Sequence, residues 1–214
     1  FFAQFNSAVK ILKVSFNFCI IVVVTEDGSI HIRSSTSGKK VTTINASCFE
    51  MDEIAEIMIT QNFGFVAVFM KSGKLHLFTI NGSLIKSVIL DKRYKSDNIH
   101  FWFTFDNVQG IDYIGFVTND NKIFYFEAFY PATLVQMKSN EKFKDVLSVN
   151  YDKFSKCFLV LNNNCEIYVV THNVLVVPIN YNIICFRYLW ILLFILFIVE
   201  QKNFYDILKI LNIY

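Results

Sequence analysis

Hydrophobic and polar positions repeat four times along the chain in one order: an apolar run, a short polar turn, then a run that alternates apolar and polar residues. The four turns align at Gly28, Gly73, Asn121 and Cys165, so successive turns lie 45, 48 and 44 residues apart. A period of about 40 to 45 residues is typical of a four-stranded propeller blade, and one such unit cannot bury its own apolar faces. The pattern predicts an all-β fold of four similar antiparallel units.

Turn residues and period-two alternation place four strands in each unit. We expect a partial WD40-like propeller over residues 1–177, with blades at about 7–47, 52–91, 98–138 and 145–177. The predicted strands cover about 8–16, 19–25, 29–33, 40–44, 54–60, 65–70, 75–80, 84–90, 100–105, 113–118, 123–127, 133–137, 146–151, 158–161, 167–171 and 174–177. Pro131 is expected in a connection rather than in a strand, because proline cannot donate to the ladder.

The expected blades are degenerate WD40 blades. The third strands end in Arg33-Ser34, Phe78-Thr79, Phe126-Glu127 and Val170-Thr171, where regular WD40 blades carry a Trp-Asp pair. We therefore expect packing of Phe and Ile to carry stability that regular blades draw from an Asp-His-Ser/Thr-Trp network. An α/β fold is disfavoured because it would need helical patterns of about 10 to 15 residues, which are absent before residue 180.

Residues 178–214 form an apolar tail that departs from the repeat. Tyr188 to Val199 is an unbroken apolar run of 12 residues, whereas a membrane-spanning helix needs about 20. Phe204, Ile207, Leu208 and Leu211 then follow at helical spacing. Three interpretations stay open for this helical tail: a packed pair of helices, a membrane anchor, or a translated segment foreign to the natural protein.

The composition indicates a folded protein with no affinity for nucleic acid. Hydrophobic residues make up 54% of the chain and charged residues only 18%, against a usual charged share of about 25%. The 20 Lys and Arg are scattered among 18 Asp and Glu, so no basic stripe is available for phosphates. Five cysteines without a CxxC motif favour free thiols in a reducing, cytoplasmic compartment. Because the chain begins with Phe1, we expect it to be part of a longer polypeptide.

Two segments resemble one known family. The stretch NFGFVAVFMKSGKLHLFTINGSLIKSVIL from Asn62 to Leu90 and the stretch GIDYIGFVTNDNKIFYFEAFYP from Gly110 to Pro131 are similar to the C-terminal WD40 region of protist BEACH-domain proteins, relatives of Beige and neurobeachin. The run Leu77 to Ser87 is the most specific part. The resemblance implies a propeller of about seven blades that follows a PH-like and a BEACH domain. It also implies a scaffold in vesicle traffic, cytoplasmic and peripheral to endomembranes.

Candidate catalytic and metal-binding residues do not converge. His31 and His76 occupy equivalent strand positions, but their counterparts are Phe124 and Tyr168, so we interpret both as ordinary strand residues. The chain has no GxSxG motif and no phosphate-binding glycine loop. Asp112 and Asp120 fall at opposite ends of one predicted strand. We therefore expect no enzyme activity, no cofactor, no metal and no small-molecule substrate.

The best candidates for protein contact are the connections between blades, because scaffolds use strands for stability and loops for binding. Two of these connections combine positive charge with an aromatic residue and are expected on the same rim. The candidate contact residues are Lys92, Arg93, Tyr94 and Lys95 in one connection and Lys142, Phe143 and Lys144 in the next. The sequence thus favours a non-enzymatic scaffold that binds proteins, including upstream domains of its own polypeptide. The alternative is a β-domain anchored to a membrane by the tail.

Overall fold

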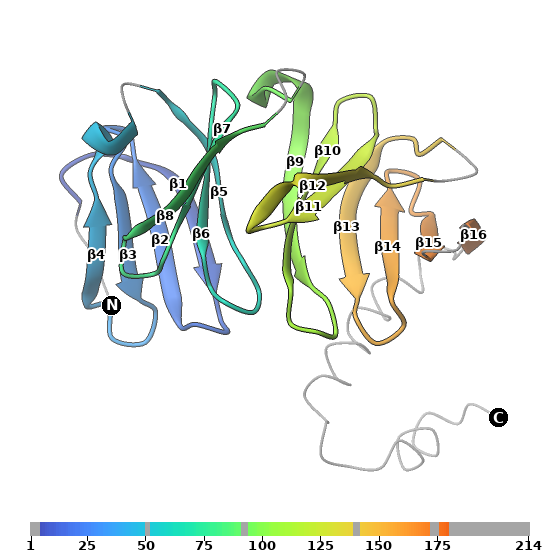
Figure 1. The fold of residues 1–214 in the computed structure, drawn as a ribbon, viewed down its shortest axis with the longest axis horizontal. Helices are drawn as coiled ribbons and strands as arrows, with labels where there is room; N and C mark the ends of the chain where they lie inside the picture. Colours follow the sequence, from blue (N-terminus) through green and yellow to red (C-terminus); the bar gives the residue numbers. More distant parts are fainter. Residues whose placement is uncertain (1–4, 50–51, 91–93, 139–141, 172–175, 180–214) are drawn as a thin grey trace, which may run out of the picture.

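The computed structural model describes residues 5–49, 52–90, 94–138, 142–171 and 176–179. These residues form four antiparallel sheets of four strands, and each sheet takes its strands in chain order (Figure 1). The first sheet contains β1 (Val9–Ser15), β2 (Ile20–Thr25), β3 (Ile30–Ser34) and β4 (Lys40–Ile44). The second contains β5 (Ile54–Ile59), β6 (Val66–Met70), β7 (Lys74–Phe78) and β8 (Leu84–Ile89).

The third sheet contains β9 (Ile99–Asp106), β10 (Asp112–Thr118), β11 (Ile123–Glu127) and β12 (Tyr130–Gln136). The fourth contains β13 (Val146–Asp152), β14 (Cys157–Asn162), β15 (Ile167–Thr171) and β16 (Val176–Ile179). Two short 3-10 helices, η1 (Ala46–Phe49) and η2 (Ser96–Asn98), lie in the connections between sheets. The predicted tail falls outside the described residues, apart from Pro178 and Ile179 at the end of β16.

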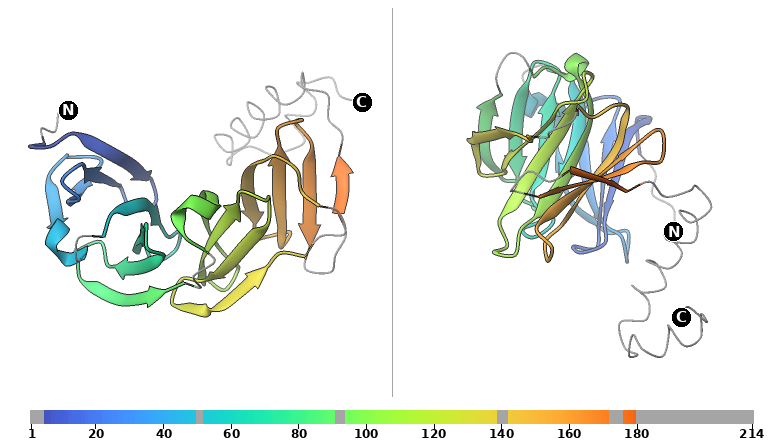
Figure 2. Two further views of the ribbon diagram at one scale, coloured as in Figure 1. Left: turned by 90° about the horizontal axis from the view of Figure 1, so that it is seen from above. Right: turned by 90° about the vertical axis from the view of Figure 1, so that its right-hand side faces the viewer.

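The sheets follow one another in a propeller-like row. Their first strands contact each other in sequence, β1 with β5, β5 with β9 and β9 with β13. Figure 2, seen from above, shows the row curving, with β8 and β12 on its outer side. For the part of the chain that the structure describes, this arrangement confirms the prediction of an all-β fold with four consecutive antiparallel sheets.

The four predicted turns are confirmed in position and in backbone geometry. Gly28, Gly73, Asn121 and Cys165 have φ of 79°, 93°, 61° and 61°. In each turn the N–H of this residue donates to the carbonyl three positions earlier, at 2.8 to 3.1 Å. Glycine and asparagine tolerate positive φ well, which is why the turns were visible in the sequence. Cys165 adopts the same geometry without that advantage.

Pro131 departs from its predicted place. It lies within β12, which begins at Tyr130 rather than near Thr133. Because β12 is the last strand of its sheet, one side of its backbone faces no ladder partner. A proline is tolerated on such an edge, where its missing N–H removes no sheet hydrogen bond.

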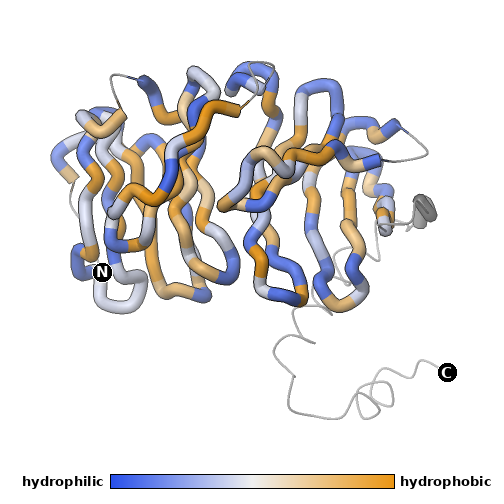
Figure 3. Tube along the Cα trace, viewed as in Figure 1, coloured by the Kyte–Doolittle hydropathy of each residue, from blue (hydrophilic) through white to orange (hydrophobic). Residues whose placement is uncertain are grey.

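The hydrophobic core consists of three layers, one between each pair of neighbouring sheets. Strand β6 is buried at every position, as its uninterrupted apolar sequence predicts. Phe101, Trp102 and Phe103 are half-buried and pack against this core, with the ring centroids of Trp102 and Phe69 4.4 Å apart on one face of the third sheet. Apolar residues follow the strands and polar residues gather at the turns (Figure 3).

Candidate functional site

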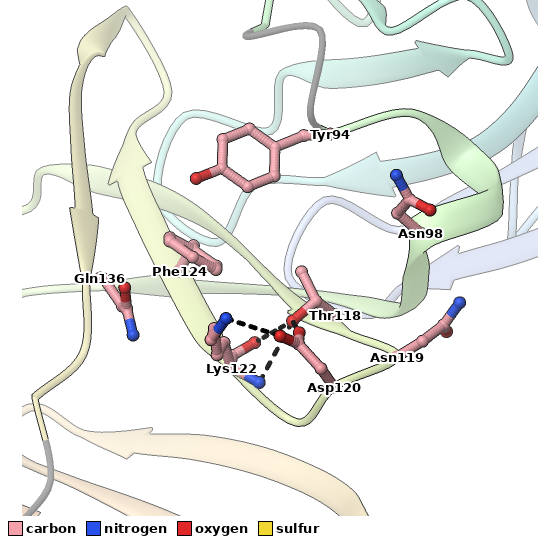
Figure 4. Close-up of a pocket in the computed structure, with 8 residues that line it drawn as sticks. All are labelled: Tyr94, Asn98, Thr118, Asn119, Asp120, Lys122, Phe124 and Gln136. Carbon is pink, nitrogen blue, oxygen red and sulfur yellow. Dashed lines mark hydrogen bonds and ion pairs between the residues drawn. The ribbon is translucent and has the colours of Figure 1, made fainter.

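The candidate site is built around the turn between β10 and β11, which is held by its own side chains (Figure 4). Thr118 Oγ1 donates to Asp120 Oδ1 at 2.5 Å, accepts the backbone N–H of Lys122 at 3.1 Å and lies 3.1 Å from the Lys122 carbonyl oxygen. Lys122 Nζ lies 2.6 Å from the second Asp120 oxygen. These bonds lower the pKa of Asp120, the Lys122 contact most and the Thr118 hydroxyl next. Asp120 therefore carries its charge at neutral pH and is already paired.

A hollow of about 420 Å³ adjoins this turn on the side of the second sheet. It is lined by Tyr94, Asn98, Thr118, Asn119, Asp120, Lys122, Phe124 and Gln136 (Figure 4). Phe124 and Tyr94 form its apolar floor, with ring centroids 5.0 Å apart. The amide side chains of Asn98, Asn119 and Gln136 are exposed at its margin. The hollow thus offers polar hydrogen-bonding groups around a small aromatic base.

A second hollow of about 410 Å³ lies on the other side of the same turn. It shares Asp120, Lys122 and Gln136 with the first and extends to Lys142 and Phe143. The two interblade connections that the sequence singled out therefore converge on one turn. We refer to this surface, from Tyr94 through the β10–β11 turn to Lys144, as the upper rim.

The structure separates the candidate contact residues into buried and exposed ones. Tyr94 and Phe143 are only 8% and 9% exposed, and both belong to the core between sheets. Lys95, Lys142 and Lys144 are exposed on the rim. The remaining candidates, Lys92 and Arg93, lie outside the described residues. The two aromatic rings thus anchor the connections to the core, because removing their large apolar surface from water is favourable. The lysines face solvent.

The histidines take part in structural hydrogen bonds. His31 Nε2 lies 3.3 Å from Thr25 Oγ1 and its Nδ1 lies 3.2 Å from Thr43 Oγ1. Thr25 also bonds Asp27, so a short polar chain crosses β2, β3 and β4. Burial lowers the pKa of His31, which keeps the ring neutral at physiological pH. The sequence did not predict this hydrogen-bonded series of side chains, although a threonine and an aspartate lie in the turn at Gly28.

His76 forms a similar bond in the second sheet, 2.9 Å from Ser87 Oγ. Among the residues that the structure describes, no three His, Cys, Asp or Glu side chains gather closely enough to hold a metal ion. Cys19, Cys48, Cys157 and Cys165 are free thiols. In the same part of the chain, no helix has the length and apolar character needed to cross a membrane.

Asp112 is an important residue whose role the sequence did not reveal. The residue is 4% exposed, and its carboxylate accepts hydrogen bonds from the backbone N–H groups of Asn62 at 2.7 Å and Phe63 at 2.8 Å. The Asn62 side-chain amide in turn donates to the Gly110 carbonyl at 2.7 Å. These bonds join the β5–β6 turn of the second sheet to the start of β10 in the third. We refer to them as the Asp112 latch.

Comparison with known proteins shows similarity of fold only. No family model and no curated protein sequence matches the chain. A solved complex of the fission yeast SREBP-SCAP binding domains aligns with a TM-score of 0.54 and 11% identity, over 84% of this chain and 50% of that one. PorZ, described as an essential surface component of the type-IX secretion system of Porphyromonas gingivalis, aligns with a TM-score of 0.53 and 13% identity, over 79% of this chain and 22% of that one. The chain therefore spans half or less of either neighbour.

Proposed function

We propose that this chain is a non-enzymatic propeller scaffold that binds another protein through the upper rim. The observation that carries the proposal is the convergence of two interblade connections on the β10–β11 turn, where two hollows adjoin. Exposed lysines and amides surround an aromatic base there, a combination suited to a polypeptide with acidic and apolar side chains. The charged groups of the turn are already paired with one another, which favours binding over catalysis.

The comparison supports the same use of the fold. The fission yeast structure is a complex of binding domains, so a protein with a similar fold serves protein association. We propose that the present chain likewise serves protein association and that it needs no cofactor and no small-molecule substrate. Loops held by rigid sheets are well suited to such contacts, because their backbone is fixed before the partner arrives.

The finer proposal is that the scaffold belongs to a BEACH-type protein in vesicle traffic, cytoplasmic and peripheral to endomembranes. Its support is the resemblance of the run from Leu77 to Ser87 to that family. The test is the sequence of the transcript upstream of Phe1. A PH-like and a BEACH domain in the same reading frame would support the proposal, and an open reading frame without them would refute it.

The alternative is a β-domain anchored to a membrane, which the apolar run from Tyr188 to Val199 favours. Alkaline carbonate extraction of membranes from cells that express the full chain separates the two hypotheses. An anchored protein stays in the pellet, whereas a peripheral scaffold is released into the supernatant. Deletion of residues 178–214 should change this distribution only if the tail is an anchor.

Rim binding is tested by panning the full chain against a random peptide library displayed on phage. We expect selected peptides to combine acidic with apolar residues. Reversing two rim charges with Lys142→Glu and Lys144→Glu should weaken the binding of these peptides about tenfold. The matched control, Lys39→Glu with Lys40→Glu, reverses two exposed charges on the first sheet and should leave their binding unchanged. Equal loss with both pairs would indicate unspecific charge attraction and refute the rim as the site.

A further inference from the structure

A cluster of five aromatic rings lies between the third and fourth sheets, at the edge opposite the upper rim. It consists of Phe105, Tyr113, Tyr125, Tyr151 and Phe158. Phe105 is central, with its ring centroid 4.8 Å from Tyr113, 4.8 Å from Tyr151 and 5.1 Å from Phe158. Phe105 and Phe158 are buried, whereas the three tyrosines are partly exposed. The two buried phenylalanines therefore form a packed apolar base, and the three tyrosines form the side of the cluster that is open to solvent.

These rings border a hollow of about 190 Å³, which we call the tyrosine hollow. Its other lining residues come from the β9–β10 connection and the β13–β14 turn, both at the lower edge in Figure 1. They are Asn107, Val108, Gln109 and Lys156. Pockets for drug-sized ligands measure about 300 to 1,000 Å³. The tyrosine hollow is smaller and suits one or two side chains of a polypeptide.

Every polar side chain of the hollow can donate a hydrogen bond: the three tyrosine hydroxyls, the amides of Asn107 and Gln109, and the ammonium group of Lys156. A tyrosine hydroxyl is protonated at physiological pH, and burial raises the pKa of Tyr113, Tyr125 and Tyr151 further above it. The Tyr113 oxygen lies 3.5 Å from Asn107 Nδ2. Within the described residues, the hydroxyls of Tyr125 and Tyr151 have no hydrogen-bond partner. No carboxylate is among the lining residues, but Glu127 and Asp152 act electrostatically on Tyr113 and Tyr151, and the exposed Lys156 adds a positive charge, so the surroundings of the hollow carry both signs of charge.

A ligand that matches this lining is apolar, rich in acceptors and poor in donors. A proline-rich segment has these properties, because proline lacks a backbone N–H and a polyproline II helix leaves its carbonyls free of internal hydrogen bonds. Aromatic-lined grooves recognise such segments in several unrelated domains, where the stiff helix loses little entropy on binding. Unpartnered tyrosine hydroxyls beside aromatic faces therefore complement proline rings and the carbonyls between them.

We propose that the tyrosine hollow binds a proline-rich segment of a protein partner in the polyproline II conformation. This inference rests on the proposed function as a protein-binding scaffold, but it assigns the ligand to the lower edge and not to the upper rim. Phe105 and Phe158 form the apolar base for the proline rings. The hydroxyls of Tyr125 and Tyr151 donate to carbonyls of the segment.

The experiment measures fluorescence anisotropy of a labelled peptide of ten prolines titrated with the full chain. A labelled peptide of alternating glycine and serine, equal in length, is the peptide control. Tyr125→Phe and Tyr151→Phe each remove one donor and keep the ring. Each should weaken decaproline binding roughly three- to tenfold, the loss of one hydrogen bond. Tyr130→Phe, the same change at an exposed tyrosine on β12, should leave the dissociation constant unchanged. Circular dichroism spectra identical to that of the wild type establish that each variant is folded.

Binding of decaproline but not of the glycine-serine peptide, weakened by the two hollow variants alone, supports the inference. Three results would overturn it: no decaproline binding by the folded chain, unchanged binding by both hollow variants, or equal weakening by Tyr130→Phe. The double variant with Lys142→Glu and Lys144→Glu distinguishes failure of this inference from failure of the proposed function. It should bind decaproline like the wild type, so rim binding and hollow binding can each fail without the other.

Discussion

Replacing Asp112 by alanine should destabilise the protein strongly, because the Asp112 latch joins two sheets through one buried carboxylate. The substitution removes the acceptor of two backbone N–H groups, from Asn62 and Phe63. A hydrogen bond to a charged group contributes about 1.5 to 3 kcal/mol to stability. Asn62 and Phe63 are exposed, so water can replace part of what is lost. We therefore expect the free energy of unfolding to fall by about 2 to 4 kcal/mol.

Urea unfolding followed by far-UV circular dichroism measures this loss at one fixed protein concentration. Asp112→Asn keeps the shape of the side chain, but its NH2 group would face one of the two backbone N–H donors, so it should lose at least half as much. Asp97→Ala, at an exposed aspartate of η2, is the control and should change the unfolding free energy by less than about 0.5 kcal/mol. A loss for Asp112→Ala no larger than that of the control would show that the latch does not stabilise the contact between sheets.

Three further predictions concern a turn, a strand and a surface ion pair. Gly73→Val should cost roughly 1 to 3 kcal/mol in thermal unfolding, because a β-branched residue resists positive φ; an unchanged midpoint would contradict this. Gly115→Ala should cost about 1 to 3 kcal/mol, because its Cβ would overlap the Phe103 ring, and Phe103→Leu in the same chain should recover part of the loss. Lys10 and then Lys71 lower the pKa of Glu53 from 4.5 to about 2, so its stabilising effect is full above pH 4.5 and disappears as the pH falls towards 2. The difference in melting temperature between wild type and Glu53→Gln should shrink over that range, and a constant difference would refute the ion pair.

The strands and turns were predictable because their causes are local. Positive φ at Gly28 and Gly73 follows from the residue type, and the alternation on either side sets which face each strand buries. The Asp112 latch was not predictable, because its partners lie 49 and 50 residues earlier in the chain. A single acidic residue at the start of an apolar strand was the only local sign.

The candidate sites were predictable only in part. Charged neighbours made Tyr94 and Phe143 look like solvent-facing loop residues, but each ring is drawn into the core by the apolar surface of the adjoining sheets. The tyrosine hollow depends on the register of separate strands, which pairs Tyr113 with Phe105 and Tyr151 with Phe158. Alternation assigns each tyrosine to a face, but only the packing of two sheets brings the rings together.

The strand order within each sheet has a consequence for how the chain folds during synthesis. Because β1 to β4 pair in the order in which they leave the ribosome, the first sheet can form from successive hairpins before the second exists. Its core layer closes only when β5 and β6 arrive, since residues of both sheets share that layer. Folding should therefore advance one sheet at a time from the N-terminus. At each stage, the sheet formed last presents an apolar face, and until the next sheet covers it this face is prone to aggregation.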